Sequence, residues 1–370
     1  MEKITIPVSR PKINAVDVEA ITNVVSSSFV AGGPQLLEFE NAVATHCGRR
    51  YGVAVSNATS ALYIALRALN LAPKSKILLP SFTIVSLLHA VILCGHIPVF
   101  IDVNKSTWNV TLEAIKKVLH QKIAAATIPE TYASAGPMSE IEDLFKKHKI
   151  PLIEDAAEGF GGSYKGKKFG SFGDISVLSF YANKLITTGE GGMVLTDHKN
   201  IYELCMSLRN LCFDKKRRFI HNDLSGNYRL TNLQAALGLS QFSRINTFYA
   251  HRKRLYNLYL KLLAPFEDLH ITFQNIPKEV ESSYWVFPVL LKANSFRATD
   301  VINRLQKKGV ESRHFFYPLS DQPFLKGEKS ESPVSMSLWK KGLYLPMGNG
   351  ISEEDVQTSS NILIHVFKGN

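Results

Sequence analysis

The sequence has few cysteines and no long apolar run. Its four cysteines show neither a CxxC pair nor the mixed Cys/His spacing of a zinc site, so we expect reduced thiols and no bound metal. The longest apolar stretches, such as residues 84–93, fall short of the roughly 18 residues that cross a bilayer. Residues 1–12, MEKITIPVSRPK, lack the apolar core of a signal peptide. These absences argue against a membrane protein or a disulfide scaffold and favour a cytoplasmic enzyme.

Acidic residues are scarcer than basic ones. The chain has 32 Asp and Glu against 43 Lys and Arg, which gives a formal net charge of +11. The basic runs at residues 165–168, 215–218 and 252–254 are scattered, and no nucleic-acid-binding motif accompanies them. We therefore interpret them as solvated faces and expect no nucleic-acid partner. A small molecule that carries a diphosphate would also be attracted by this charge.

With 370 residues, 45% hydrophobic and 20% charged, the chain has the composition of a globular α/β protein with a sizeable core. Helical segments alternate with short apolar strands, which are predicted at residues 53–55, twice within residues 76–103, at residues 123–129, before Asp155, and at the apolar runs of residues 177–181 and 193–195. This alternation predicts a mostly parallel, doubly wound central sheet.

The alternation stops after residue 197. A helix is predicted over residues 201–211, and residues 225–263 are predicted to form one long helix. We place a domain boundary near Phe248, which gives a large domain (residues 1–248) and a smaller C-terminal α/β domain (residues 249–370). The smaller domain is predicted to contain a strand within residues 282–291 and a helix over residues 298–310.

A lysine stands between two of the buried strands. Lys184 precedes the glycine-rich turn of residues 187–192, in which glycine permits tight turns and close approach of a ligand. Burial between strands lowers the pKa of a lysine, and a neutral amine is what a Schiff base requires. Taken alone, Lys184 is also compatible with a solvent-exposed lysine, so the other residues decide.

Three further features accompany Lys184. Residues 53–55 lead into a helix that begins at Ala58, and the free N–H groups of such a helix start can bind phosphate, with hydroxyl groups of Thr59 and Ser60 nearby. Asp155 ends a buried strand, where a carboxylate needs a partner. Phe82 follows another strand at the edge where ligands of such sheets bind. Together these residues match what pyridoxal 5'-phosphate (PLP) requires.

The sequence resembles the DegT/StrS family of nucleotide-sugar aminotransferases, which are PLP enzymes of the aspartate-aminotransferase fold (fold type I). The resemblance covers nearly the whole chain through the blocks FVAGGPQLLEFE, SNATSALYIAL, PSFT, IEDAAEGFGGSYKGKKFGSFGD, SFYANKLITTGEGGMV, GNYRLTNLQAALG, GVESRHFFYPL and GLYLP. So many blocks in the same order make a chance match implausible.

The resemblance implies a role for each candidate residue. Lys184 would bind the cofactor covalently and act as the acid/base, while the cofactor alternates between PLP and pyridoxamine 5'-phosphate. Asp155 would pair with the pyridinium nitrogen, and Phe82 would stack on the ring. The cofactor phosphate would be bound by Ala58, Thr59 and Ser179. Glu158 would approach the ring hydroxyl from a position that is often Gln in the family.

The resemblance also implies substrate contacts and a homodimer. Substrate contacts are expected from Arg229, Arg313, His314 and Tyr317. Asn227 would reach the phosphate bound to the neighbouring subunit, although its sequence context is equally typical of a helix cap. The chain departs from the family at Ala58, where Gly is usual, and at His314, where many relatives carry Pro. Its loop at residues 130–137 lacks the His and Gly that are frequent in relatives.

Within the family, the segments SFYANK, TTGEGGM and SRHFFYPL are most similar to the members that aminate C4 of GDP-4-keto-6-deoxymannose to form GDP-perosamine. Related 3-dehydratases carry His in place of the lysine, so Lys184 favours transamination. The resemblance implies glutamate as amino donor. Amination at C3 or C4 of a UDP- or dTDP-linked keto sugar is the alternative, and a non-catalytic regulatory protein is a third reading that Lys184 and Asp155 oppose.

Overall fold

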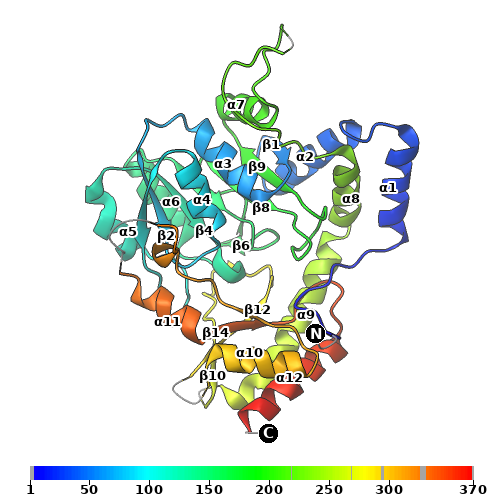
Figure 1. The fold of residues 1–370 in the computed structure, drawn as a ribbon, viewed down its shortest axis with the longest axis vertical. Coiled ribbons are helices and arrows are strands. Elements are labelled where there is room, and N and C mark those ends of the chain that lie inside the picture. Colours follow the sequence, from blue (N-terminus) through cyan, green and yellow to red (C-terminus); the bar gives the residue numbers. More distant parts are fainter. Residues whose placement is uncertain (1–3, 218, 268, 293–295, 326–330, 369–370) are drawn as a thin grey trace.

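The computed structural model describes residues 4–217, 219–267, 269–292, 296–325 and 331–368. Arg218, the last residue of one predicted basic run, lies outside them. In Figure 1 a seven-stranded sheet occupies the upper half of the molecule and a four-stranded sheet the lower half. None of the helices in these ranges combines the length and the apolarity that a membrane crossing needs.

The seven-stranded sheet has the strand order β1-β9-β8-β5-β4-β2-β3. Its strands are β1 (Tyr51–Val55), β2 (Lys76–Pro80), β3 (Ile97–Ile101), β4 (Ile123–Pro129), β5 (Leu152–Asp155), β8 (Ile175–Ser179) and β9 (Gly192–Thr196). Strand β9 runs antiparallel to both neighbours, and all other pairs are parallel. The predicted mostly parallel sheet is confirmed.

Successive residues of each strand point to opposite faces of this sheet and build two separate cores. Val53 and Val177 pack with the helices α3 (Ala58–Ala68), α4 (Ser86–Leu93) and α7 (Lys199–Arg209). Ala54 and Leu178, one position further along the same strands, pack with α2 (Pro34–His46), α5 (Leu112–Val118), α6 (Met138–Lys147) and α8 (Asn232–Phe242). Helix α1 (Ala15–Ser27) packs outside α8. Helices therefore cover both faces.

The C-terminal part contains the antiparallel sheet β10-β12-β14-β13. Its strands are β10 (Ile271–Phe273), β12 (Phe287–Leu291), β13 (Arg313–His314) and β14 (Gly342–Leu345), and its helices are α9 (Ile245–Leu263), α10 (Ala298–Lys307), α11 (Pro333–Lys341) and α12 (Glu353–Phe367). Its core includes Ile6 from the other end of the chain. A third sheet joins β11 (Val280–Glu281) to β6 (Ser163–Tyr164) and β7 (Lys167–Lys168). The boundary near Phe248 stays a prediction.

The predicted long helix over residues 225–263 is wrong. Thr231 caps α8 in a reciprocal pair with Gln234, and α8 ends at Phe242. Arg244 then leaves the helical conformation with φ −111° and ψ 12° before α9 begins. The residues before Thr231 are extended and pair with other segments, because the backbone of Tyr228 bonds to Ser56 and Arg209.

Three other predicted elements are shorter than expected, and the first is the predicted helix over residues 298–310, which ends at Lys307. Helix α7 ends at Arg209 instead of residue 211, since Leu211 and Cys212 adopt positive φ angles of 59° and 51°. In the predicted strand at residues 282–291 only Phe287–Leu291 pair, and Tyr284 has a φ of 54°. The non-paired residues before β12 include Trp285, which reaches the cavity described next.

Candidate active site

A cavity of about 310 Å³ lies where β5 and β8 end, next to the start of α3. It brings together most of the predicted site residues, namely Ala58, Thr59, Asp155, Glu158, Ser179, Lys184 and Arg313. Trp285, Phe316 and Tyr344 from the C-terminal part complete its wall. Both the large sheet and the C-terminal part therefore enclose one site.

One end of the cavity is the N-terminus of α3. The Asn57 side chain accepts a hydrogen bond from the Ser60 amide at 2.8 Å, and Ala61 makes the first backbone bond of the helix, to the Asn57 carbonyl. The amides of Ala58 and Thr59 precede that bond, and both residues line the cavity. Ala58 replaces glycine without strain, because its φ is not positive. Amides at a helix start attract anions such as phosphate.

Strand β9 approaches this helix start closely. A Cβ atom on Gly192 would lie 2.6 Å from the Asn57 carbonyl oxygen and 2.7 Å from the Ala58 nitrogen. These distances are shorter than any Cβ contact that a folded protein tolerates, so glycine is required here. Ser179, which pairs with Gly192 across β8 and β9, contributes its hydroxyl group to the same cavity.

The other end of the cavity gathers an amine and two carboxyl groups. Burial lowers the pKa of Lys184, although the nearby charges of Glu158 and Asp155 oppose that effect. Burial raises the pKa of Asp155 to about 6 and that of Glu158 to about 7. The three pKa values are thus shifted toward one another, an arrangement that suits proton transfer.

Backbone amides fix the two carboxyl groups. The Asp155 carboxylate accepts from the Ala157 amide at 3.2 Å, and Glu158 accepts from the Tyr132 amide at 2.8 Å. Tyr132 is itself buried, with a φ of 57°, and its ring stacks on Phe316. In this structure the loop at residues 130–137 thus supports Glu158.

Trp285 is a site residue that the sequence analysis missed. The Lys184 Nζ lies 3.8 Å from the centroid of the Trp285 ring, a cation–π distance. The indole N–H donates to the Asn183 side chain at 3.3 Å. No local pattern marks Trp285, because its contact with Lys184 depends on how the C-terminal part packs on the large sheet.

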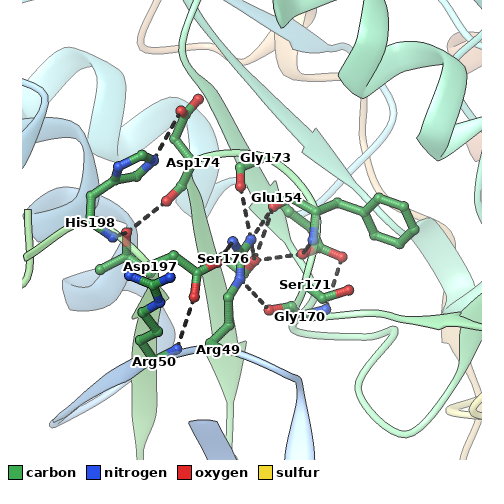
Figure 2. A network of polar contacts seen from close by, with 12 residues as sticks. Arg49, Arg50, Glu154, Gly170, Ser171, Gly173, Asp174, Ser176, Asp197 and His198 are labelled. Atoms are coloured by element: carbon green, nitrogen blue, oxygen red, sulfur yellow. Dashed lines mark hydrogen bonds and ion pairs between the residues drawn. The ribbon is translucent and has the colours of Figure 1, made fainter. Parts of the chain in front are cut away.

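Glu154 precedes Asp155 but belongs to a different network. Its carboxylate accepts from the amides of Gly170 and Phe172, both at 2.9 Å, and from the Ser176 hydroxyl at 2.6 Å. Figure 2 shows these groups converging with Arg49, which donates to the Ser176 hydroxyl at 2.9 Å. Because strand residues alternate, this network anchors β5 on the face opposite Asp155.

Glu130 is a second buried acid that the sequence did not reveal. Both of its carboxyl oxygens are buried, and the Glu154 side chain lies nearby. Burial, together with the nearby charges of Glu154 and Asp155, raises its pKa well above the ordinary value. Its backbone amide donates to the Asp155 carbonyl at 3.3 Å, which ties the end of β4 to the end of β5.

The structure does not place Phe82 on the cavity. Its side chain is 0% exposed and packs among Tyr132, Phe315 and Phe316, whereas Ile84 lines the cavity. A ring buried in this way does not present a face to a ligand. The ring-stacking role assigned to Phe82 is therefore not supported by this geometry.

Of the predicted substrate residues near β13, only Arg313 lines the cavity. Its guanidinium also lies 3.0 Å from Glu311. His314 follows it on the strand and contacts Thr299 at 3.3 Å instead, as expected for the opposite face. Tyr317 packs edge-on against Trp339, with ring centroids 4.7 Å apart. The substrate roles of His314 and Tyr317 stay predictions.

Asn227 and Arg229 lie outside this cavity, on the surface of the chain. The helix-cap alternative for Asn227 is wrong, because Thr231 caps α8. Both residues are exposed, and the Asn227 side chain accepts only a 3.3 Å bond from the Arg229 amide among the described contacts. Arg229 lines a separate surface pocket with Lys215 and Lys216. A role for Asn227 in a neighbouring subunit stays a prediction.

The residues present fit PLP in the chemistry of their donors. The start of α3 and Ser179 suit a phosphate group, and Asp155 suits a protonated ring nitrogen. Lys184 supplies an amine with a lowered pKa in the same cavity.

Comparisons with known proteins identify the family of the chain. Residues 11–363 match the DegT/DnrJ/EryC1/StrS aminotransferase family. The chain is 32% identical to GDP-perosamine synthase of Escherichia coli O157:H7, with 95% of each chain covered. It is 28% identical to the UDP-4-amino-4,6-dideoxy-N-acetyl-beta-L-altrosamine transaminase of Campylobacter jejuni, with 97% of each covered.

The fold also matches solved structures over its full length. The crystal structure of the aminotransferase TlmJ from Streptoalloteichus hindustanus superposes with a TM-score of 0.91 at 24% identity, covering 98% of this chain and 100% of that one. The predicted fold type I architecture is thereby confirmed. The chain belongs to the DegT/DnrJ/EryC1/StrS aminotransferase family, whose members are PLP-dependent sugar aminotransferases.

Proposed function

We propose that this protein is a GDP-perosamine synthase, which transfers an amino group from glutamate to the C4 ketone of GDP-4-keto-6-deoxymannose for polysaccharide or O-antigen biosynthesis. The observation that carries the proposal is the meeting of Lys184, Asp155 and the α3 N-terminus in one cavity of a full-length family member. The choice of sugar is supported by the 32% identity to the E. coli synthase.

When bound, PLP would supply an electron sink for the negative charge that develops on the amino donor. The chain's own residues would do the rest. Lys184 would remove a proton from the donor carbon and return it to the cofactor side, and the burial that lowers its pKa favours the neutral amine that this role needs. Asp155 would hold negative charge at the ring nitrogen, and the amides of Ala58 and Thr59 would bind the phosphate.

We also propose that the enzyme is a cytoplasmic homodimer with shared active sites. All four cysteines are free thiols, which fits a reducing compartment. Asn227 and Arg229 are exposed on a single subunit, so both are available to a second copy. Asn227 does not line the cavity of its own subunit, so in the proposed dimer it would contribute to the cavity of the neighbouring subunit.

A second candidate function is amination of a UDP- or dTDP-linked keto sugar at C3 or C4. It is favoured by the similarity to the C. jejuni transaminase, which is nearly as high as that to the E. coli enzyme. A non-catalytic role is disfavoured by the retained pair of Lys184 and Asp155 in the cavity.

Turnover of a small panel of substrates tests the proposal. Purified protein with glutamate should convert GDP-4-keto-6-deoxymannose, and NMR of the product should show an amino group at C4. The Lys184→Ala variant should fold but lose turnover by a factor of at least roughly 10²–10⁴, the contribution of a general acid/base. Preferential turnover of a UDP- or dTDP-linked sugar would replace the proposed substrate, and no turnover of any sugar would refute the function.

A further inference from the structure

The backbone that carries Lys184 is held by side chains of the C-terminal part. Arg252 donates from Nη2 to the carbonyl of Lys184 at 2.7 Å and to that of Asn183 at 3.2 Å. Asn349 donates to the carbonyl of Leu185 at 2.8 Å. Residues 183–185 belong to no helix or strand, so these bonds take the place of a regular backbone ladder.

Arg252 is unusual for a buried cation. It lies on α9 and is 1% exposed. Besides the two carbonyls, it donates to the Asn349 side chain at 2.7 Å and to the Trp285 carbonyl at 3.4 Å. Within the described residues none of its hydrogen-bond partners is a carboxylate, although burying an unpaired charge is costly. Four of its five N–H donors tie the Lys184 segment to the loops around it.

Trp285 connects this cluster to the amino group itself. Its carbonyl accepts from Arg252, its indole N–H donates to Asn183, and its ring lies under the Lys184 Nζ. The backbone of Lys184 and the surface on which its amino group rests are therefore fixed by the same guanidinium.

We propose that Arg252 is a positioning residue for Lys184, holding the backbone at residues 183–184 so that the amino group projects over Trp285 and toward Asp155 and Glu158. The proposal rests on the proposed function, in which Lys184 moves protons within the cavity.

The positive charge of Arg252 also affects the amino group of Lys184. It lowers the pKa of Lys184, whereas Asp155 after β5 and Glu158 in the following loop raise it. Glu190 and Arg313 are the other charged groups on the cavity wall. Loss of the guanidinium should therefore leave Lys184 with a higher pKa and a less fixed backbone.

Hydrogen exchange of the purified protein tests the backbone contacts. In Arg252→Met, amide exchange over residues 183–191 should rise roughly 10- to 100-fold, the loss expected for hydrogen bonds from a charged donor. In Arg252→Lys it should also rise, because one ammonium group cannot reproduce a planar fork that reaches several acceptors. The matched control is Arg254→Met, since the Arg254 side chain is 62% exposed on the same helix. That variant should exchange like the wild type.

The effect of the Arg252 charge on the pKa of Lys184 is tested by acylation. The cofactor-free protein is treated with acetic anhydride at a series of pH values, and mass spectrometry measures the acylation of each lysine. The midpoint for Lys184 should move upward in Arg252→Met and stay near the wild-type value in Arg252→Lys, which keeps the charge. Wild-type exchange at residues 183–191 in both variants, or an increase spread evenly over the whole chain, would overturn the proposal.

If Arg252→Met does not fold, the amide exchange of Arg252→Lys over residues 183–191 tests the proposal by itself. Neither measurement uses turnover, so a protein that shows both effects yet aminates no sugar would refute the proposed function and retain the role of Arg252 in holding Lys184.

Discussion

Lys184 and Trp285 meet with the amino nitrogen 3.8 Å from the indole centroid. Lys184 follows strand β8 of the large sheet, and Trp285 precedes strand β12 of the C-terminal part. The electron-rich face of an indole stabilises a charged ammonium group by about 0.5–2 kcal/mol. Trp285 therefore acts against the burial that lowers the pKa of Lys184.

Replacing Trp285 should lower the pKa of Lys184 further, because the charged amine loses this support. In cofactor-free Trp285→Leu, acylation of Lys184 should begin at a lower pH than in the wild type. Trp285→Phe, which keeps an aromatic face, should show a smaller change. An unchanged midpoint in Trp285→Leu would mean that the ring contact has no electrostatic effect on the amine.

Asp155→Asn should change stability and turnover in opposite directions. The pKa of Asp155 is raised to about 6 by burial, so its charge opposes folding of the cofactor-free protein at pH 7.5. The Asn variant should then melt at a higher temperature than the wild type without cofactor. Its turnover should fall on the order of 10²–10³, as when one preorganised charge-stabilising group is removed. Thermal melting with and without PLP, combined with single-turnover kinetics, measures both effects, and wild-type kinetics would contradict the assignment.

Glu158→Gln should reveal a titration near neutral pH. Since burial raises the pKa of Glu158 from 4.5 to about 7, the folded protein binds more protons than the unfolded chain in this window, and the wild type loses stability as the pH rises. A glutamine can still accept from the Tyr132 amide but does not titrate. The stability advantage of the variant should therefore grow between pH 4.5 and 7, to at most about 3 kcal/mol, and stay constant above. Urea unfolding at several pH values, in the absence of cofactor, is the measurement. A difference that does not vary with pH would show that Glu158 keeps an ordinary pKa.

Mixed dimers test the proposed role of Asn227. Asn227→Asp would place a carboxylate near the partner's phosphate and impair the enzyme, as does Lys184→Ala. If Asn227 serves the neighbouring subunit, a heterodimer of the two variants has one site with both lesions and one intact site. Activity should then return on mixing. Confirmed subunit exchange without recovered activity would assign Asn227 to its own subunit.

Much of the candidate site could be predicted from local sequence patterns. The strand before Ala58, the strand that ends at Asp155 and the turn after Lys184 each lie within a short stretch, and the family resemblance joined them into one site. The cap of α8 also has a local signal, because the Thr231-x-x-Gln234 pattern is typical of a capping box and indicates Thr231 rather than Asn227.

Long-range packing explains the residues that were missed. Trp285 and Arg252 reach Lys184 only because the C-terminal part folds against the large sheet, and no spacing in the sequence reports such a contact. The same holds for Glu130, whose burial depends on the ends of β4 and β5 lying side by side. Phe82 is the reverse case: its position at a strand end predicts a ligand contact, whereas in the structure its ring packs against Tyr132 and Phe315.

Gly192 has no side chain that could contact a ligand, yet it affects how closely strand β9 approaches the start of α3. A methyl group there would overlap Asn57 and Ala58, and so would force the start of α3 away from β9. Strand β9 pairs with β8, beyond which Lys184 follows. The distance between the start of α3, where we propose that phosphate binds, and Lys184 thus depends on the absence of one carbon atom, and an alanine at position 192 would change that distance without removing any functional group.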